Sequence, residues 1–171
     1  MVVLRPTRKL HSVLPLQTNA DAVSDTALGD WYVNRLVVDR WPLLLLVSAN
    51  ALLPVLIPAR DVRTLPAQLA SIVGGRLRRA SIDPALVARE VERMAPVVVA
   101  PTCDRSVLGI MVDFAKAIPF YLVPGEWDET TLPFVESRLA ETPCFAGRAR
   151  EATVFPDKAA PERLRARWSS R

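Results

Sequence analysis

Proline is the residue that most restricts how this chain can fold. The sequence of 171 residues holds fifteen prolines and only six glycines. Proline fixes φ and lacks a backbone N–H, so helix interiors and central strands exclude it. Twelve prolines are spread along the chain so that they leave only short uninterrupted segments: Pro15, Pro42, Pro54, Pro58, Pro66, Pro84, Pro96, Pro101, Pro119, Pro124, Pro133 and Pro143. This spacing predicts short elements with tight connections and argues against a bundle of long helices.

Residues 41–59 form a segment of nineteen residues without a charge, flanked by Arg40 and Arg60. Its length would permit a membrane span. The prolines within it favour a strand over residues 43–47, a turn over 48–50 and a strand over 52–57. Because Pro54 has no N–H to donate, we expect the second strand at a sheet edge or at a bulge. We therefore expect a soluble protein that does not associate with membranes.

The remaining hydrophobic patterns complete an α+β fold. Residues 31–38 read as a strand that turns at Asp39 and Arg40 into the hairpin, which gives an N-terminal antiparallel meander of three strands, or four with residues 2–4. Several short helices pack against it, and we expect them at 65–77, 83–94, 102–118 and 128–140. Short strands are expected at 96–100 and 153–155, with a terminal helix starting at Pro161. Length favours one domain over residues 1–171 with a basic C-terminal segment at 148–171.

The helix expected at 102–118 is apolar on nearly every side, which is typical of a buried helix. Thr102 and Asp104 are both good N-cap residues, and Pro119 would end the helix. Gly109 in the middle of a helix costs roughly 1 kcal/mol relative to alanine. Close packing of a neighbouring backbone would explain why glycine is present there.

This helix also carries a family resemblance. The pattern T-x-x-R-S-V-L-G-x-M at residues 102–111, followed by an acidic residue and Phe114, resembles the core motif of a bacterial family, domain of unknown function 6933. Residues 5–10 resemble its R-x-T-x-K-L start, residues 30–40 its D-W strand block, and residues 141–144 its T-P-C turn. The family tends to have Lys where this chain has Pro101, and Asn where it has Val112. The resemblance implies no activity, cofactor or partner.

The sequence lacks most of the motifs that mark enzyme active sites and metal sites. The two cysteines, Cys103 and Cys144, and the single histidine, His11, do not form a metal-ligand pattern, so we expect no metal and no cofactor. The absence of a signal-peptide pattern and the low cysteine content favour a reducing, cytoplasmic compartment. No nucleophile motif or phosphate-binding glycine loop is present. Whether the protein is an enzyme stays open.

One constellation of candidate site residues survives. Arg105 and Ser106 lie at the expected start of a helix, where free N–H groups favour anions. With Asp113 on the same helix and Asn34 and Arg35 on the 31–38 strand, they are candidates for an anion or ligand site. The competing interpretation is a structural ion pair between Arg105 and Asp39 or Asp113.

The C-terminal segment carries the whole net charge. Residues 148–171 contain seven basic and three acidic residues, which matches the net charge of +4 for the chain. Arg163, Arg165 and Arg167 are candidates for contact with nucleic acid, although a solvated terminal helix would look the same. The leading hypothesis is a non-enzymatic binding module for a protein or nucleic acid. The alternative is a small enzyme acting on a phosphodiester or nucleotide through Arg105, Ser106 and Asp113.

Overall fold

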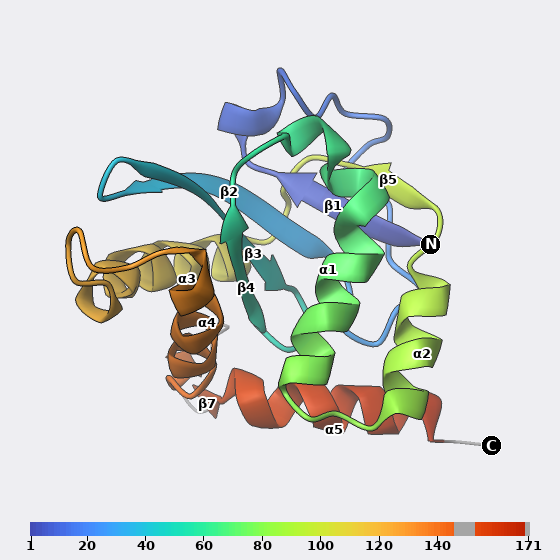
Figure 1. Ribbon diagram of the computed structural model, residues 1–171. Helices are drawn as coiled ribbons and strands as arrows, with labels where there is room; N and C mark the ends of the chain where they lie inside the picture. Colours follow the sequence, from blue (N-terminus) through green and yellow to red (C-terminus); the bar gives the residue numbers. More distant parts are fainter. Residues whose placement is uncertain (146–152, 170–171) are drawn as a thin grey trace.

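The computed structural model describes residues 1–145 and 153–169, and its centre is one mixed β-sheet (Figure 1). The strands are β1 (Val2–Pro6), β2 (Trp31–Val38), β3 (Trp41–Ser48), β4 (Pro54–Pro58) and β5 (Val97–Val99), in the spatial order β4-β3-β2-β1-β5. With the helices on both sides, the fold is α+β, as the sequence predicts.

The antiparallel meander β2-β3-β4 is confirmed. The turn between β2 and β3 consists of Asp39 and Arg40, which both adopt positive φ angles (51° and 70°) and fit a tight two-residue hairpin. Residues 41–59 form the two paired strands expected from the prolines, with Pro54 on the edge strand β4. No helix among the described residues has the length and hydrophobicity needed to cross a membrane.

The first strand, β1, does not extend the antiparallel meander as a fourth strand. β1 pairs in parallel with β2 on one side and with β5 on the other. The parallel pairing is possible because residues 7–30 connect β1 to β2, and this connection is long enough for the chain to cross back. The short 3-10 helix η1 (Arg8–Leu10) lies in this connection.

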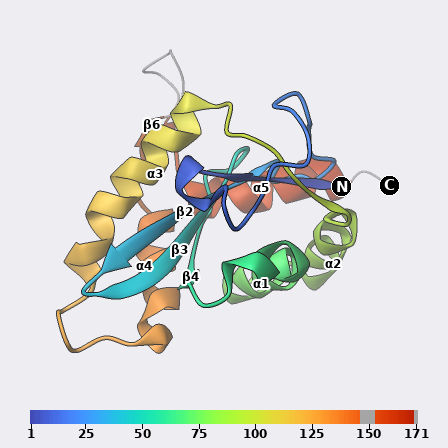
Figure 2. The same ribbon diagram turned by 90° about the horizontal axis from the view of Figure 1, so that it is seen from above.

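The helices cover the two faces of the sheet in pairs. α1 (Leu65–Arg79) and α2 (Pro84–Arg93) pack on one face with Leu4, Trp31 and Val33. α3 (Arg105–Ala117) and α4 (Leu132–Ala140) pack on the other, where Tyr32, Leu45 and Val47 point. Figure 2 shows the two pairs on opposite sides of the strands. Short 3-10 helices, η2 (Val62–Thr64), η3 (Ile118–Tyr121) and η4 (Glu129–Thr131), join these elements.

The expectation that α3 is buried all round is wrong. Val107, Ile110, Met111 and Phe114 form its buried face, whereas Val112 is 52% exposed. Nothing lies within 4 Å of the position where Gly109 would carry a Cβ, so close packing does not explain this glycine. The helix covers the sheet from outside, and its second apolar side faces solvent.

The C-terminal helix also begins elsewhere than expected. α5 runs from Pro156 to Trp168, so Pro161 lies inside it rather than at its start. Pro156 takes the first helical position, which tolerates proline because the N–H there has no helical partner. A small two-stranded sheet, β6 (Cys144–Phe145) with β7 (Thr153–Val154), comes before this helix.

Both edges of the main sheet carry contacts that oppose pairing with a further strand. Pro54 and Pro58 of β4 have no N–H, and the N–H of Leu56 donates to Oε1 of Glu136 on α4 at 2.9 Å. At the other edge, Val99 of β5 exchanges hydrogen bonds with the backbone and the side chain of Gln17. Free edges invite pairing with other chains, and these contacts occupy the outward N–H groups of Leu56 and Val99.

Candidate functional site

Segments that are distant in the sequence meet near the carboxyl ends of β1 and β5. Arg5 is 1% exposed, and its Nε donates to Oδ2 of Asp30 at 2.5 Å. The same guanidinium donates to the backbone carbonyls of Pro101, Ala20 and Ala22. It therefore ties β1, the connection before β2, and the segment after β5 into one unit. Arg5 is a structural residue, because Asp30 and these carbonyls engage all three of its nitrogens.

The sequence-based site search missed Arg5. The signal was present, because an arginine that follows Val2, Val3 and Leu4 in a short strand needs a buried partner. Pro101 takes part through its main-chain oxygen, so the contact does not depend on the side chain at this position. Val112 lies on the exposed side of α3.

The start of α3 is capped from within the protein. Oδ1 of Asp104 accepts from the N–H of Ser106 at 2.8 Å, and the N–H of Asp104 donates to the Tyr32 hydroxyl at 3.0 Å. Burial and the neighbouring Cys103 thiol raise the pKa of Tyr32 well above its usual range, so this hydroxyl stays protonated. A carboxylate therefore already occupies the helix N-terminus where an anion was expected.

The structure spreads the candidate residues of α3 apart. Arg105, Ser106 and Asp113 are all exposed. Arg105 and Asp113 are eight residues apart, which is about 12 Å along a helix axis. Asp113 lies close enough to Cys144 that, after burial, its charge is the second cause of the raised pKa of that thiol, about 11. These residues do not converge on one reacting atom.

Arg105 forms neither of the two structural ion pairs considered for it. Among residues 1–145 and 153–169, no ion pair joins Arg105 to Asp39 or Asp113. Asp39 instead accepts hydrogen bonds from the Gly125 backbone N–H and from Nε1 of Trp127. Its role is to fasten the loop before η4 to the β2–β3 turn.

The two candidates on β2 lie in different surroundings. Asn34 is half-buried, and its Oδ1 accepts from the Thr7 hydroxyl at 2.8 Å. Arg35 is exposed and lines a wide hollow together with Lys9, Ala115 and Pro119. Two cations at this hollow are compatible with an anionic ligand, but Arg105 and Ser106 do not line it.

The three arginines of α5 do not form one surface. Arg167 pairs with Asp25 at 2.5 Å, so it holds the helix to the rest of the protein. Arg163 and Arg165 are exposed, but residues two apart on a helix point to nearly opposite sides. Arg163 lines a hollow of about 520 Å³ with Asn50, Thr153, Phe155, Lys158 and Glu162, which we call the α5 hollow. Arg165 is not part of it.

Two buried glutamates carry structural roles that sequence reasoning did not assign. Glu90 of α2 accepts from the N–H groups of Ala27 and Leu28, both at 2.9 Å, and from Nε1 of Trp168 at 2.7 Å. Glu136 of α4 pairs with Arg79 and lies 3.5 Å from Nε of Arg76. Within residues 1–145 and 153–169, no three His, Cys, Asp or Glu side chains are grouped to hold a metal ion.

The geometry describes an α+β protein with a mixed sheet, in which Arg5 joins β1 to the segments before β2 and after β5. A family model described as Domain of unknown function (DUF6933) matches residues 3–159, and the chain belongs to this family. The match ends within α5, so Arg163, Arg165 and Arg167 lie beyond it. Neither the curated proteins nor the solved structures contain a significant match to the chain.

Proposed function

We propose that the protein is a non-enzymatic binding module that contacts single-stranded nucleic acid at the α5 hollow. The supporting observation is that an aromatic ring and two basic side chains share one surface depression. Phe155 is the N-cap residue of α5, Lys158 lies in the first turn, and Arg163 lies in the middle of the helix. Asn50, from the turn between β3 and β4, adds an amide that can both donate and accept.

The chemistry of this hollow suits a base and its phosphate. The Nζ atom of Lys158 lies 5.0 Å from the centre of the Phe155 ring. Proteins that bind single strands combine an aromatic face for stacking with basic side chains along the backbone. A base that stacks on Phe155 would displace the lysine stem, and the released ammonium would then reach the adjacent phosphate.

The surrounding charge supports the same ligand. The acidic residue in the hollow, Glu162, is outnumbered by Lys158 and Arg163. Residues 148–171 carry seven basic and three acidic side chains, so an approaching polyanion meets a net positive segment. We further propose a cytoplasmic location in a bacterial cell, supported by two cysteines that do not pair with each other.

Fluorescence anisotropy with a labelled single-stranded RNA of about 12 nucleotides tests this proposal. We expect binding that weakens steeply as salt rises from about 50 to 200 mM, because neutralised phosphates release their counterions. The double variant Lys158→Glu/Arg163→Glu should lower the affinity by at least about tenfold, and Phe155→Ala should lower it without reducing the salt dependence.

Arg165→Glu is the matched control, since it reverses one charge on the same helix outside the hollow. It should retain most of the affinity. Absence of binding at low salt, or an equal loss with Arg165→Glu, would overturn the proposed surface. Cleavage of the RNA during the assay would contradict the non-enzymatic part of the proposal and favour the enzyme alternative.

A further inference from the structure

A second hollow, distant in sequence from α5, lies where the start of β3 meets the segment before α4. It encloses about 360 Å³ and is lined mainly by Trp41, Pro42, Pro58, Trp127, Asp128 and Glu129. We call it the tryptophan hollow. Its volume is within the range of sites that hold small molecules. Trp41 is 60% exposed, which is unusual for so large an apolar side chain.

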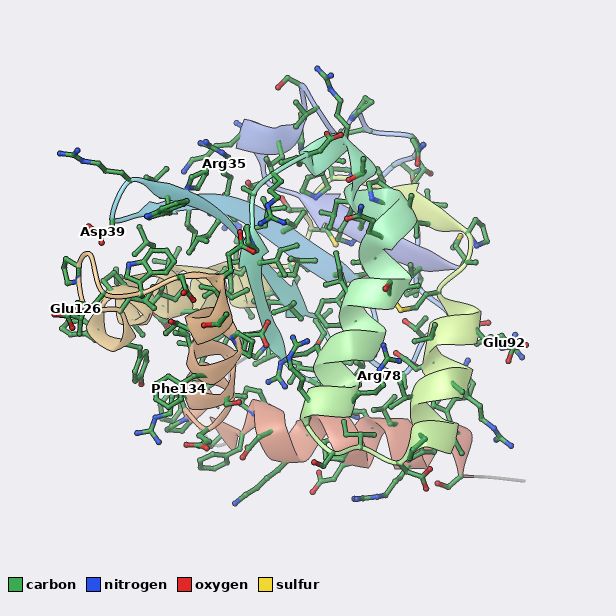
Figure 3. All side chains as sticks on the ribbon, viewed as in Figure 1. Arg35, Asp39, Arg78, Glu92, Glu126 and Phe134 are labelled. Atoms are coloured by element: carbon green, nitrogen blue, oxygen red, sulfur yellow. The ribbon has the colours of Figure 1, made fainter. Side chains whose placement is uncertain are left out.

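The Trp127 ring is anchored by a hydrogen bond, and the Trp41 ring lies against it. Their centroids are 6.3 Å apart, and the rings are inclined by 63°, so the edge of one faces the other. Nε1 of Trp127 donates to Oδ2 of Asp39, and the N–H of Gly125 donates to the same oxygen. Asp39 thus ties the Trp127 segment to the β2–β3 turn. Figure 3 shows Asp39 and Glu126 at this corner of the molecule.

The hollow is negatively charged. Asp128 and Glu129 line it, and of the residues that the structure describes no basic side chain does. Hydrogen bonds from the side chain and backbone of Thr130 lower the pKa of Asp128 below its usual value, so its carboxylate is charged at neutral pH. Glu129 forms an ion pair with Arg60, whose side chain is 75% exposed. An exposed pair of this kind is weak, so a ligand can compete for Glu129.

We propose that the tryptophan hollow binds a small organic cation of the alkylammonium class. The negative face of an exposed indole ring attracts a cation of low hydration, and quaternary ammonium groups are recognised in this way. The carboxylates of Asp128 and Glu129 add charge complementarity. An anion would be repelled here, and a neutral apolar ligand would gain nothing from the two carboxylates.

Choline and its uncharged isostere 3,3-dimethyl-1-butanol provide the sharpest test, because they share a shape and differ in charge. Each compound is titrated with the full chain, and ligand-detected NMR monitors the binding. We expect choline to bind and its N-methyl protons to shift upfield because they lie above an indole ring. The isostere should bind roughly tenfold more weakly or not at all. Equal affinities for the two compounds, or no binding of choline, would overturn the proposal.

Variants locate the binding. Trp41→Ala and Asp128→Asn should each weaken choline binding severalfold, whereas Phe134→Ala, an exposed aromatic residue of α4 outside the hollow, should not. Arg60→Gln removes the cation that competes for Glu129, so it should strengthen binding. An unchanged affinity in both Trp41→Ala and Asp128→Asn would show that choline binds elsewhere and would overturn the assignment.

Discussion

Single buried residues fasten the distant parts of this chain together. Glu90 is fully buried, and Ala27, Leu28 and Trp168 all donate to it. Arg5 does the same with the opposite charge, because it donates to the Asp30 carboxylate and to the backbone carbonyls of Pro101, Ala20 and Ala22. Buried charges are costly unless hydrogen bonds satisfy them. Such residues therefore mark places where the protein depends on one side chain for its local structure.

We predict that Glu90→Ala destabilises the protein by about 3 kcal/mol or more, because the amides of Ala27 and Leu28 then lack an acceptor and each costs about 1–3 kcal/mol. Chemical denaturation monitored by circular dichroism measures this loss. Glu92→Ala is the control, since Glu92 lies on the same helix and points into solvent (Figure 3); it should change stability by less than about 0.5 kcal/mol. Similar losses for both variants would contradict the role of Glu90.

The two thiols should differ in reactivity. Cys103 is exposed, whereas burial and the charge of Asp113 raise the pKa of Cys144 from 9.0 to about 11. The thiolate is the reactive form, so we predict that a disulfide reagent at pH 8 modifies Cys103 in the folded protein and Cys144 only after unfolding. Counting the modified thiols in the protein and in Cys103→Ser checks this. Rapid modification of Cys144 in the folded protein would contradict it.

The same pKa shift predicts a pH dependence of stability. Because the folded protein holds the Cys144 proton more tightly than the unfolded chain, its contribution is fully present below pH 9 and is lost as pH rises toward 11. The free energy of unfolding should therefore fall across this range. Tyr32 adds a loss of the same sign, so the comparison with Cys144→Ala isolates the thiol: the variant should show the shallower slope. Identical slopes would contradict this prediction.

At the scale of elements, α3 illustrates how hydrophobicity can mislead. The helix carries its own apolar residues on nearly every side, yet only one of its sides contacts the sheet. We predict that Met111→Ala, at a buried position, costs about 2–5 kcal/mol. Leu108→Ala should cost less than about 2 kcal/mol because Leu108 is half-buried, and Val112→Ala less than about 0.5 kcal/mol. Denaturant titration ranks the three variants, and a loss for Val112→Ala equal to that for Met111→Ala would show that the outer side of α3 is covered.

The protection of the edge strand β4 could be predicted only in part from the sequence. The prolines at positions 54 and 58 indicate an edge, because they cannot donate to a neighbouring strand. The partner of the remaining outward N–H, Glu136, is eighty residues away. Local sequence gives no signal for such a distant partner, so the edge was predicted and the contact that closes it was not.

For the whole molecule, the sequence predicts those features that depend on local pattern. The hairpin of residues 41–59, the meander and the helix starts at Asp83 and Asp104 follow from prolines, turns and caps. The parallel pairing of β1 depends on which strands meet after a long connection, and periodicity does not encode that. The candidate site suffered from the same limit, because Arg105, Arg35 and Arg163 are alike in sequence but lie on separate surfaces.

The C-terminal helix α5 is the largest departure from a sequence-based view, which treats a basic terminal helix as dispensable. Leu164 and Ala160 are fully buried in the core shared with α1 and α2, and the backbone carbonyl of Trp168 accepts from Arg89. Figure 1 shows α5 running from the lower end of α4 beneath α1 and α2. Reversal of Arg163, Arg165 and Arg167 together would therefore also break the ion pair of Arg167 with Asp25.

We predict that a chain ending at residue 155 loses cooperative thermal unfolding and binds a hydrophobic dye, because the apolar face covered by α5 becomes exposed to water. Leu164→Ala in the full chain should cost about 2–5 kcal/mol as a large-to-small change in a core. Arg165→Ala, on the outer side of the same helix, should cost less than about 0.5 kcal/mol. Calorimetry of the three proteins provides the measurement. Cooperative unfolding of the shortened chain near the temperature of the full chain would show that α5 is an appendage, and the tether from Trp168 to Glu90 would then contribute little to the fold.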